Sequence, residues 1–155
     1  MKFVYAIIIT IVLIIGIGFV FLHGGGHDQI GAVSTNFRLL GPNDKVVVQR
    51  FDDPDVQNVS CYASFAQTGG VAGGAGVAED PSQFALNCVA HGAVNIPANL
   101  PNQAQVGAIS ASLLFKHFVL TRMVDRQTNT LVYVLISTKV LTGSPANAVS
   151  AVPGS

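Results

Sequence analysis

The chain has 155 residues, equal numbers of basic and acidic side chains (8 of each) and a charged fraction of only 10%. A neutral chain with so few charges lacks the clustered Lys and Arg that nucleic acid requires, so no nucleic-acid partner is expected. Its length is sufficient for one domain with a hydrophobic core in addition to a short terminal segment.

The first feature along the chain is an uncharged apolar run over residues 3–22, which follows Lys2. Twenty residues at about 1.5 Å each give a helix of roughly 30 Å, the thickness of a bilayer's hydrocarbon core. We therefore predict a signal-peptide or signal-anchor helix over residues 1–22 that crosses the inner membrane with a cytoplasmic N-terminus, and export of the remainder to the periplasm. The length of the run favours an anchor, whereas small residues at Gly16-Ile-Gly18 and at 24–26 leave signal cleavage open.

Residues 23–30 are rich in Gly and His and predict a flexible tether, which leaves residues 31–155 as one exported domain. His23 and His27 are four residues apart, but a glycine linker gives two imidazoles no rigid geometry. We expect no metal at this pair.

Alternation of apolar and polar residues predicts a series of strands joined by short turns. The expected strands cover 31–39, 45–52, 59–68, 105–115, 117–125 and 130–137, with a further extension over 139–141. An irregular crossing is expected over 96–102 because of its two prolines, and an irregular tail over 143–153.

A single main helix is expected after the third strand. Asp80 has the character of an N-cap and Pro81 of a first helical residue, Phe84 and Cys88 lie four apart, and Gly92 is a plausible stop. Strands with short connections plus one helix predict an α+β fold, built mostly of antiparallel sheet.

The glycine-rich stretch 69–76 precedes that expected helix. It lacks the Gly-Lys-Ser/Thr ending of a phosphate-binding loop, and the charges of Glu79 and Asp80 oppose a bound anion. It is interpreted as a structural loop, with a mobile lid as the alternative.

The chain has two cysteines, Cys61 and Cys88. An even number in an exported domain predicts one disulfide, and the alternative is a pair of buried thiols. Cys61 with His91 or His117 would form a thiol–imidazole pair only if the thiol were free, so this arrangement is disfavoured.

Ordered sequence blocks show a family resemblance. They are Phe51-Asp-Asp-Pro-Asp-Val56, Asn58-Val-Ser-Cys-Tyr62, Thr68-Gly-Gly70, Ala78-Glu-Asp80, Cys88, Gly143-Ser-Pro145, Asn147-Ala148 and Ser150-Ala-Val-Pro153. Together they resemble the CreA family of bacterial envelope proteins, from Ile30-Gly31 to Pro153. The resemblance implies a periplasmic protein, and the family has no established biochemical activity.

The Asp52-Asp53-Pro54-Asp55 segment gathers three carboxylates at the end of an expected strand. It is interpreted first as a structural turn, with cation or ligand contact and acid/base catalysis as alternatives. The candidate ligand or partner site comprises Phe51, Asp52, Asp53, Asp55, Glu79, Asp80, Ser144 and Asn147.

The sequence contains no nucleophile elbow of the form G-x-S-x-G. We therefore expect a non-enzymatic periplasmic binding or accessory protein, with no cofactor and an envelope protein as its partner. The alternative is a metal-dependent or acid/base hydrolase, in which the carboxylates of the Asp-rich turn, Glu79 and Asp80 converge on one cleft.

Overall fold

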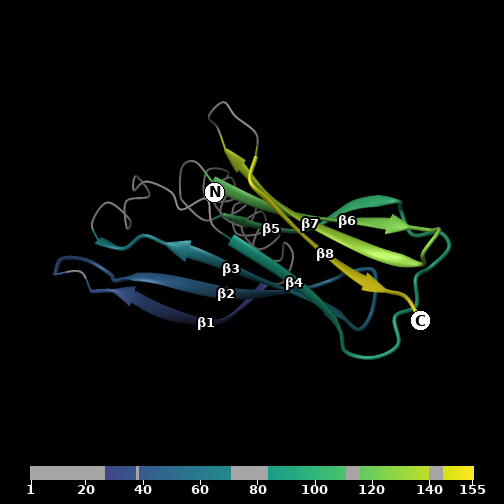
Figure 1. The fold of residues 1–155 in the computed structure, drawn as a ribbon, viewed down its shortest axis with the longest axis horizontal. Helices are drawn as coiled ribbons and strands as arrows, with labels where there is room; N and C mark the ends of the chain where they lie inside the picture. Colours follow the sequence, from purple (N-terminus) through teal and green to yellow (C-terminus); the bar gives the residue numbers. More distant parts are fainter. Residues whose placement is uncertain (1–26, 38, 71–83, 111–115, 140–144) are drawn as a thin grey trace, which may run out of the picture.

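The computed structural model describes residues 27–37, 39–70, 84–110, 116–139 and 145–155. These residues form two four-stranded antiparallel sheets that pack as a sandwich (Figure 1). The first sheet has the order β1 (His27–Asn36), β2 (Asp44–Asp52), β3 (Val59–Gln67) and β4 (Phe84–Ala90). The second has the order β5 (Gln103–Ser110), β6 (Lys116–Asp125), β7 (Thr130–Lys139) and β8 (Asn147–Pro153).

Period-two alternation places the apolar residues between the sheets. On β3, Cys61, Ala63 and Phe65 are buried, while the residues between them are more exposed. The ring of Phe65 meets that of Phe118 from β6 at a centroid distance of 4.5 Å, which joins the two inner faces. At Gly107 on β5 an added Cβ would lie 2.8 Å from the Phe51 ring, so the approach of the two sheets requires glycine there.

Several predicted strands are confirmed. The strands expected over 45–52 and 59–68 correspond to β2 and β3, and the expected hairpin over 117–137 corresponds to β6 and β7. The irregular crossing over 96–102 contains no strand, and β5 starts two residues earlier than expected.

The predicted α+β class with one main helix is wrong, because the elements of the described residues are all strands. Phe84–Ala90 is strand β4, with Cys88 buried and Phe84 and Leu86 packed against the core. A separation of four residues fits one helical face but also one strand face, so the spacing of Phe84 and Cys88 did not decide between them. Leu86 distinguishes the two structures. In a strand it lies on the same face as Phe84 and Cys88, whereas in a helix it would point away from them.

The expected irregular tail is also wrong. Residues 147–153 form β8, in which Ala148, Ser150 and Val152 are less exposed than their neighbours. β8 pairs only with β7 in its sheet, and an edge strand tolerates the proline at its last position, Pro153.

The membrane-helix prediction falls on residues 1–22, which lie outside the described part of the chain. Within the described part, no helix is long and apolar enough to cross a membrane. Strand β1 begins at His27, so the last four residues of the expected tether belong to a strand.

Candidate functional site

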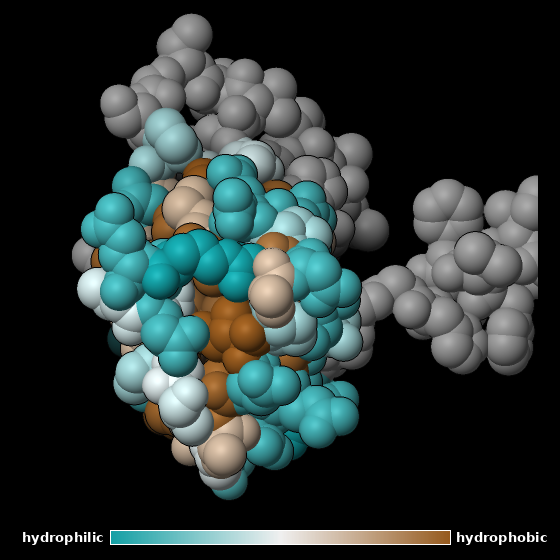
Figure 2. Space-filling view, turned by 90° about the vertical axis from the view of Figure 1, so that its right-hand side faces the viewer, coloured by the Kyte–Doolittle hydropathy of each residue, from teal (hydrophilic) through white to brown (hydrophobic). Residues whose placement is uncertain are grey.

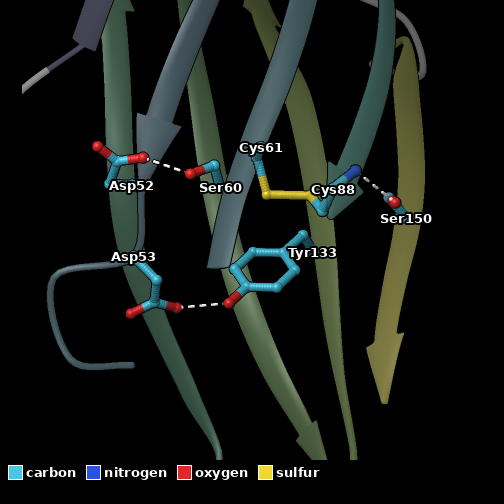
Figure 3. Close-up of a disulfide and its surroundings, with 7 residues drawn as sticks. All are labelled: Asp52, Asp53, Ser60, Cys61, Cys88, Tyr133 and Ser150. Carbon is cyan, nitrogen blue, oxygen red and sulfur yellow. Dashed lines mark hydrogen bonds between the residues drawn. A yellow bond between two sulfur atoms is a disulfide. The ribbon is translucent and has the colours of Figure 1, made fainter. Parts of the chain in front are cut away.

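The Asp-rich turn between β2 and β3 is built around a buried carboxylate. The Asp53 side chain is 1% exposed. Its Oδ1 accepts hydrogen bonds from the backbone N–H groups of Asp55 (2.9 Å) and Val56 (3.1 Å) and from Nη1 of Arg122 (2.6 Å). Its Oδ2 accepts from the hydroxyl of Tyr133 at 2.6 Å (Figure 3). Four donors therefore hold this carboxylate in place.

Arg122 supplies the opposite charge from the second sheet. Its side chain is 0% exposed, and its Nη2 donates to Oδ2 of Asp55 at 3.0 Å. It lies in one inward-facing row with Tyr133 and Ser150, since Arg122 pairs with Tyr133 and Tyr133 with Ser150. A guanidinium is rarely fully buried without a partner, so the ion pair to Asp53 accounts for its position.

Tyr133 stays protonated in this environment. Burial raises the pKa of its hydroxyl, and the hydrogen bond to Asp53 and the negative charge of that carboxylate act in the same direction. The phenol is thus a fixed donor, and it links the turn to β7.

Asp52 points elsewhere. It accepts a hydrogen bond from the Ser60 hydroxyl at 2.6 Å (Figure 3) and lies 3.3 Å from Nε of Arg50. Arg50 also pairs with Asp28 at 2.6 Å. Asp52 therefore has its own partners, Arg50 and Ser60. Asp53 and Asp55 share the guanidinium of Arg122, and Asp53 also accepts from Tyr133.

The predicted disulfide is confirmed between Cys61 and Cys88. The two residues are directly opposite on β3 and β4, and both are buried. The backbone N–H of Cys88 donates to Oγ of Ser150 on β8 at 2.9 Å, which links the neighbouring edges of the two sheets (Figure 3). No thiol remains for a thiol–imidazole pair, because the chain's two cysteines are both bridged.

Four segments far apart in the sequence meet at one end of the sandwich, near the C-terminus in Figure 1. We call this surface the loop end; it comprises residues 53–58, 91–102, 126–129 and 154–155. The N–H of His91 donates to the carbonyl of Asn58 at 2.8 Å, and Nδ2 of Asn58 donates to the carbonyl of Ala93 at 2.8 Å. Asn58 has a φ of 64°, in the left-handed region that Asn tolerates.

The C-terminal residues and the β6–β7 turn complete the loop end. Ser155 and Val94 exchange two hydrogen bonds of 2.9 Å, and the N–H of Gly154 donates to the carbonyl of Asn129 at 2.7 Å. Arg126 donates to the carbonyls of Pro97 (3.1 Å) and Leu100 (2.7 Å). The segments are therefore tied into one surface by side chains and backbone together.

Asp125 begins the β6–β7 turn as a local acceptor. The hydroxyl of Thr128 and the backbone N–H of Gln127 donate to its carboxylate and hold its pKa below the usual range. Its charge thus stabilises the turn that Arg126 joins to the segment 91–102.

Figure 2 faces the side of the molecule on which the loop end lies. The described surface there is mainly hydrophilic, with an apolar area enclosed by polar residues. The exposed polar residues of the loop end include Asp55, Gln57, Asn95, Asn99 and Gln127, and its partly exposed apolar residues include Ile96 and Pro97.

The structure does not bring all predicted site residues together. Phe51 is buried in the core, next to Asp52 and Asp53, and Asn147 lies at the start of β8, opposite Ile136. Ser155 and the loop end follow the other end of that strand. Three further predicted residues, Glu79, Asp80 and Ser144, lie outside the described residues.

Sequence reasoning missed Arg122, Tyr133 and Ser150 as partners of the turn and the disulfide. One signal was available in the sequence of β6, which is rich in β-branched residues. Arg122 is two residues from the apolar Leu120 and therefore lies on the same, inward face, where a charged side chain needs a partner. Among the residues that the structure describes, no group of three or more His, Cys, Asp or Glu side chains is placed to hold a metal ion.

Comparisons with known proteins cover nearly the same span as this fold. The family described as CreA protein matches residues 30–155. Protein CreA of Escherichia coli K12 is 42% identical over 146 residues, which cover 91% of this chain and 93% of that protein. Protein CreA of Escherichia coli O157:H7 matches with the same identity and coverage. No solved structure matches the chain significantly.

Proposed function

Since the chain belongs to the CreA family, we propose that it is a non-enzymatic binding or accessory protein of the bacterial envelope, which contacts its partner through the loop end. One observation carries this proposal. The three described carboxylates of the Asp-rich turn, which could have formed a catalytic or metal site, are each bound to side chains of the domain itself.

The geometry of Asp53 supports a structural role. A general base needs a free lone pair within hydrogen-bond reach of a substrate proton. Asp53 is 1% exposed and already accepts from two backbone N–H groups, Arg122 and Tyr133. Asp52 and Asp55 reach solvent but have different partners, Ser60 and Arg122. Asp53 and Asp55 meet at the buried guanidinium of Arg122, so the three carboxylates of the turn do not face one cleft as the hydrolase alternative requires.

The construction of the loop end supports binding. Hydrogen bonds fix its segments before any partner arrives, which lowers the entropy lost on association. An apolar area with a polar rim is the usual composition of a protein–protein interface. Asp52 and Asp55 are the predicted site residues that stay exposed at or next to this surface, so we propose them as contacts for donor groups of the partner.

We propose the periplasm as the location of the domain. The basic residue before the apolar run 3–22 supports export, and a disulfide persists in that oxidising compartment. The run is either removed on export or holds the chain at the inner membrane. Mass spectrometry of the mature chain separates the two cases, and recovery of the protein with its cysteines reduced in a cytoplasmic fraction would contradict both.

Photo-crosslinking in intact cells tests the binding function. A photoreactive amino acid replaces the exposed residues Gln57 or Asn99 of the loop end, and the matched control replaces Val149, which is exposed on β8. We expect a discrete adduct with an envelope protein from the first two positions and not from the third.

The proposal fails if all three positions give the same adducts. It also fails if the purified full chain turns over an envelope substrate and Asp52→Asn, which keeps the shape of the side chain, abolishes that turnover.

A further inference from the structure

A second surface lies at the opposite end of the molecule, on strand β1 and the turn that follows it (Figure 1). Large apolar side chains that project into solvent gather in residues 30–40. They are 54–88% exposed and comprise Ile30, Val33, Phe37, Leu39 and Leu40. An apolar group of this size within one short segment is typical of an interaction site.

β1 is also an edge strand of its sheet. It pairs with β2 on one side, and among the described residues no strand pairs with its other side. Edge strands are commonly protected by Lys, Pro, an inward charge or β-bulges. The ladder of β1 with β2 has register shifts between Gln29 and Gly31 and between Ser34 and Asn36, which leave Gly31–Ser34 as its regular stretch. β1 contains no Lys or Pro, and the charge of Asp28 is compensated by Arg50 at 2.6 Å.

We propose that β1 pairs antiparallel with β1 of a second copy of this chain, so that two first sheets join into one sheet of eight strands. The charge pattern of the strand favours a second copy. In a two-fold pair centred within residues 31–34, the two Asp28 side chains are separated by roughly 20–40 Å at about 3.4 Å per residue, so no like charges meet. The formal net charge of zero adds no long-range repulsion between copies.

The side chains at the centre of β1 are also compatible with antiparallel pairing of two β1 strands. Val33 lies opposite Val46 on β2, and Val46 lies opposite Ala66 on β3, so an apolar row reaches the free edge. Pairing of two copies joins two such rows. At Gly31 an added Cβ would meet no atom within 4 Å, so the backbone near the proposed two-fold axis is open to close approach.

The proposal does not depend on the function of the loop end, and the oligomeric state of the full chain tests it. Light scattering during size-exclusion chromatography in mild detergent, with the detergent mass subtracted, should give about twice the chain mass. Val33→Lys brings like charges together at the new sheet and should raise the dissociation constant at least tenfold (order of magnitude, from about 1.4 kcal/mol per tenfold). Val149→Lys is the matched control, because Val149 is 64% exposed and Val33 is 68% exposed, and it should leave the dimer unchanged.

A second probe remains informative if Val33→Lys fails to fold. Gly31→Cys with a nitroxide label should give an intermolecular distance below about 30 Å by pulsed electron resonance, at the β1 spacing of about 3.4 Å per residue. A monomeric wild-type chain, equal effects of the two lysine variants, or a dimer without this short distance would each overturn the proposal. The last result would assign association to another surface, such as the apolar run 3–22.

Discussion

Replacing Asp53 by Asn tests the buried network most severely. The substitution keeps the size of the side chain but removes the buried one of the two carboxylates that compensate Arg122, whose side chain is 0% exposed. Breaking a buried ion pair by removing one partner typically costs about 3–5 kcal/mol, because the remaining charge is left in the interior. A domain with about 5–15 kcal/mol of total stability would lose a large part of it.

The matched control is Asp55→Asn, which removes the other carboxylate bound to Arg122. Asp55 is 51% exposed, so solvent screens that pair and its loss should cost less than about 1 kcal/mol. Equilibrium urea unfolding of the full chain, followed by circular dichroism, measures both. For a denaturant slope of about 1.5 kcal/mol/M, Asp53→Asn should lower the midpoint by about 2–3 M without changing the slope. Equal midpoint shifts for the two variants, or a shift of Asp53→Asn below about 0.5 M, would refute the reasoning.

Three further predictions concern the disulfide, Tyr133 and Ser150. Replacing both Cys61 and Cys88 by Ser should destabilise the domain by about 3–4 kcal/mol, because the bridge closes a loop with a sequence separation of 27; an unchanged urea midpoint would contradict this. The pKa of Tyr133 is raised by folding, so its contribution to stability is complete below its unfolded value of about 10 and decreases as the pH rises above it. The difference in urea midpoint between wild type and Tyr133→Phe should therefore become smaller from pH 9 to pH 11. A difference that stays constant over this range would contradict a raised pKa of the buried Tyr133 hydroxyl. Ser150→Ala leaves the N–H of Cys88 without its acceptor and should cost about 1–3 kcal/mol in thermal or urea unfolding, whereas Ser64→Ala on the outer face should cost less than about 0.5 kcal/mol.

Local patterns predicted the elements whose pairing is local. The hairpin of β6 and β7 has a four-residue turn, and its alternation is long enough to read from the chain. The disulfide followed from the number of cysteines, since two cysteines allow a single connectivity.

The errors arose where two structures share one pattern. Phe84 and Cys88 fit both a helix face and a strand face. Pro153 indicated an irregular tail, because a proline is excluded from a central strand, but β8 is an edge strand, which tolerates it. In each case packing in the sandwich, and not local propensity, determined the element.

The network of the Asp-rich turn could be predicted only in part. Its role as a structural turn was among the interpretations, because Asp readily accepts from backbone N–H groups two and three residues ahead. Its partner Arg122 lies 69 residues further along the chain and on the other sheet, so the pairing depends on the register and packing of both sheets. No sequence period encodes such a contact.

Amide hydrogen exchange across the loop end tests the central claim most directly, because the proposed function requires that these loops form one fixed surface. The donors to follow are the backbone N–H groups of Val56, His91, Val94, Gly154 and Ser155. All five should exchange markedly more slowly than the N–H groups of unbonded loop residues such as Asn99, and Asp53→Asn should accelerate exchange at Val56 more than at Ser155. Exchange of these groups at the rate of an open loop in the wild-type chain would contradict the account.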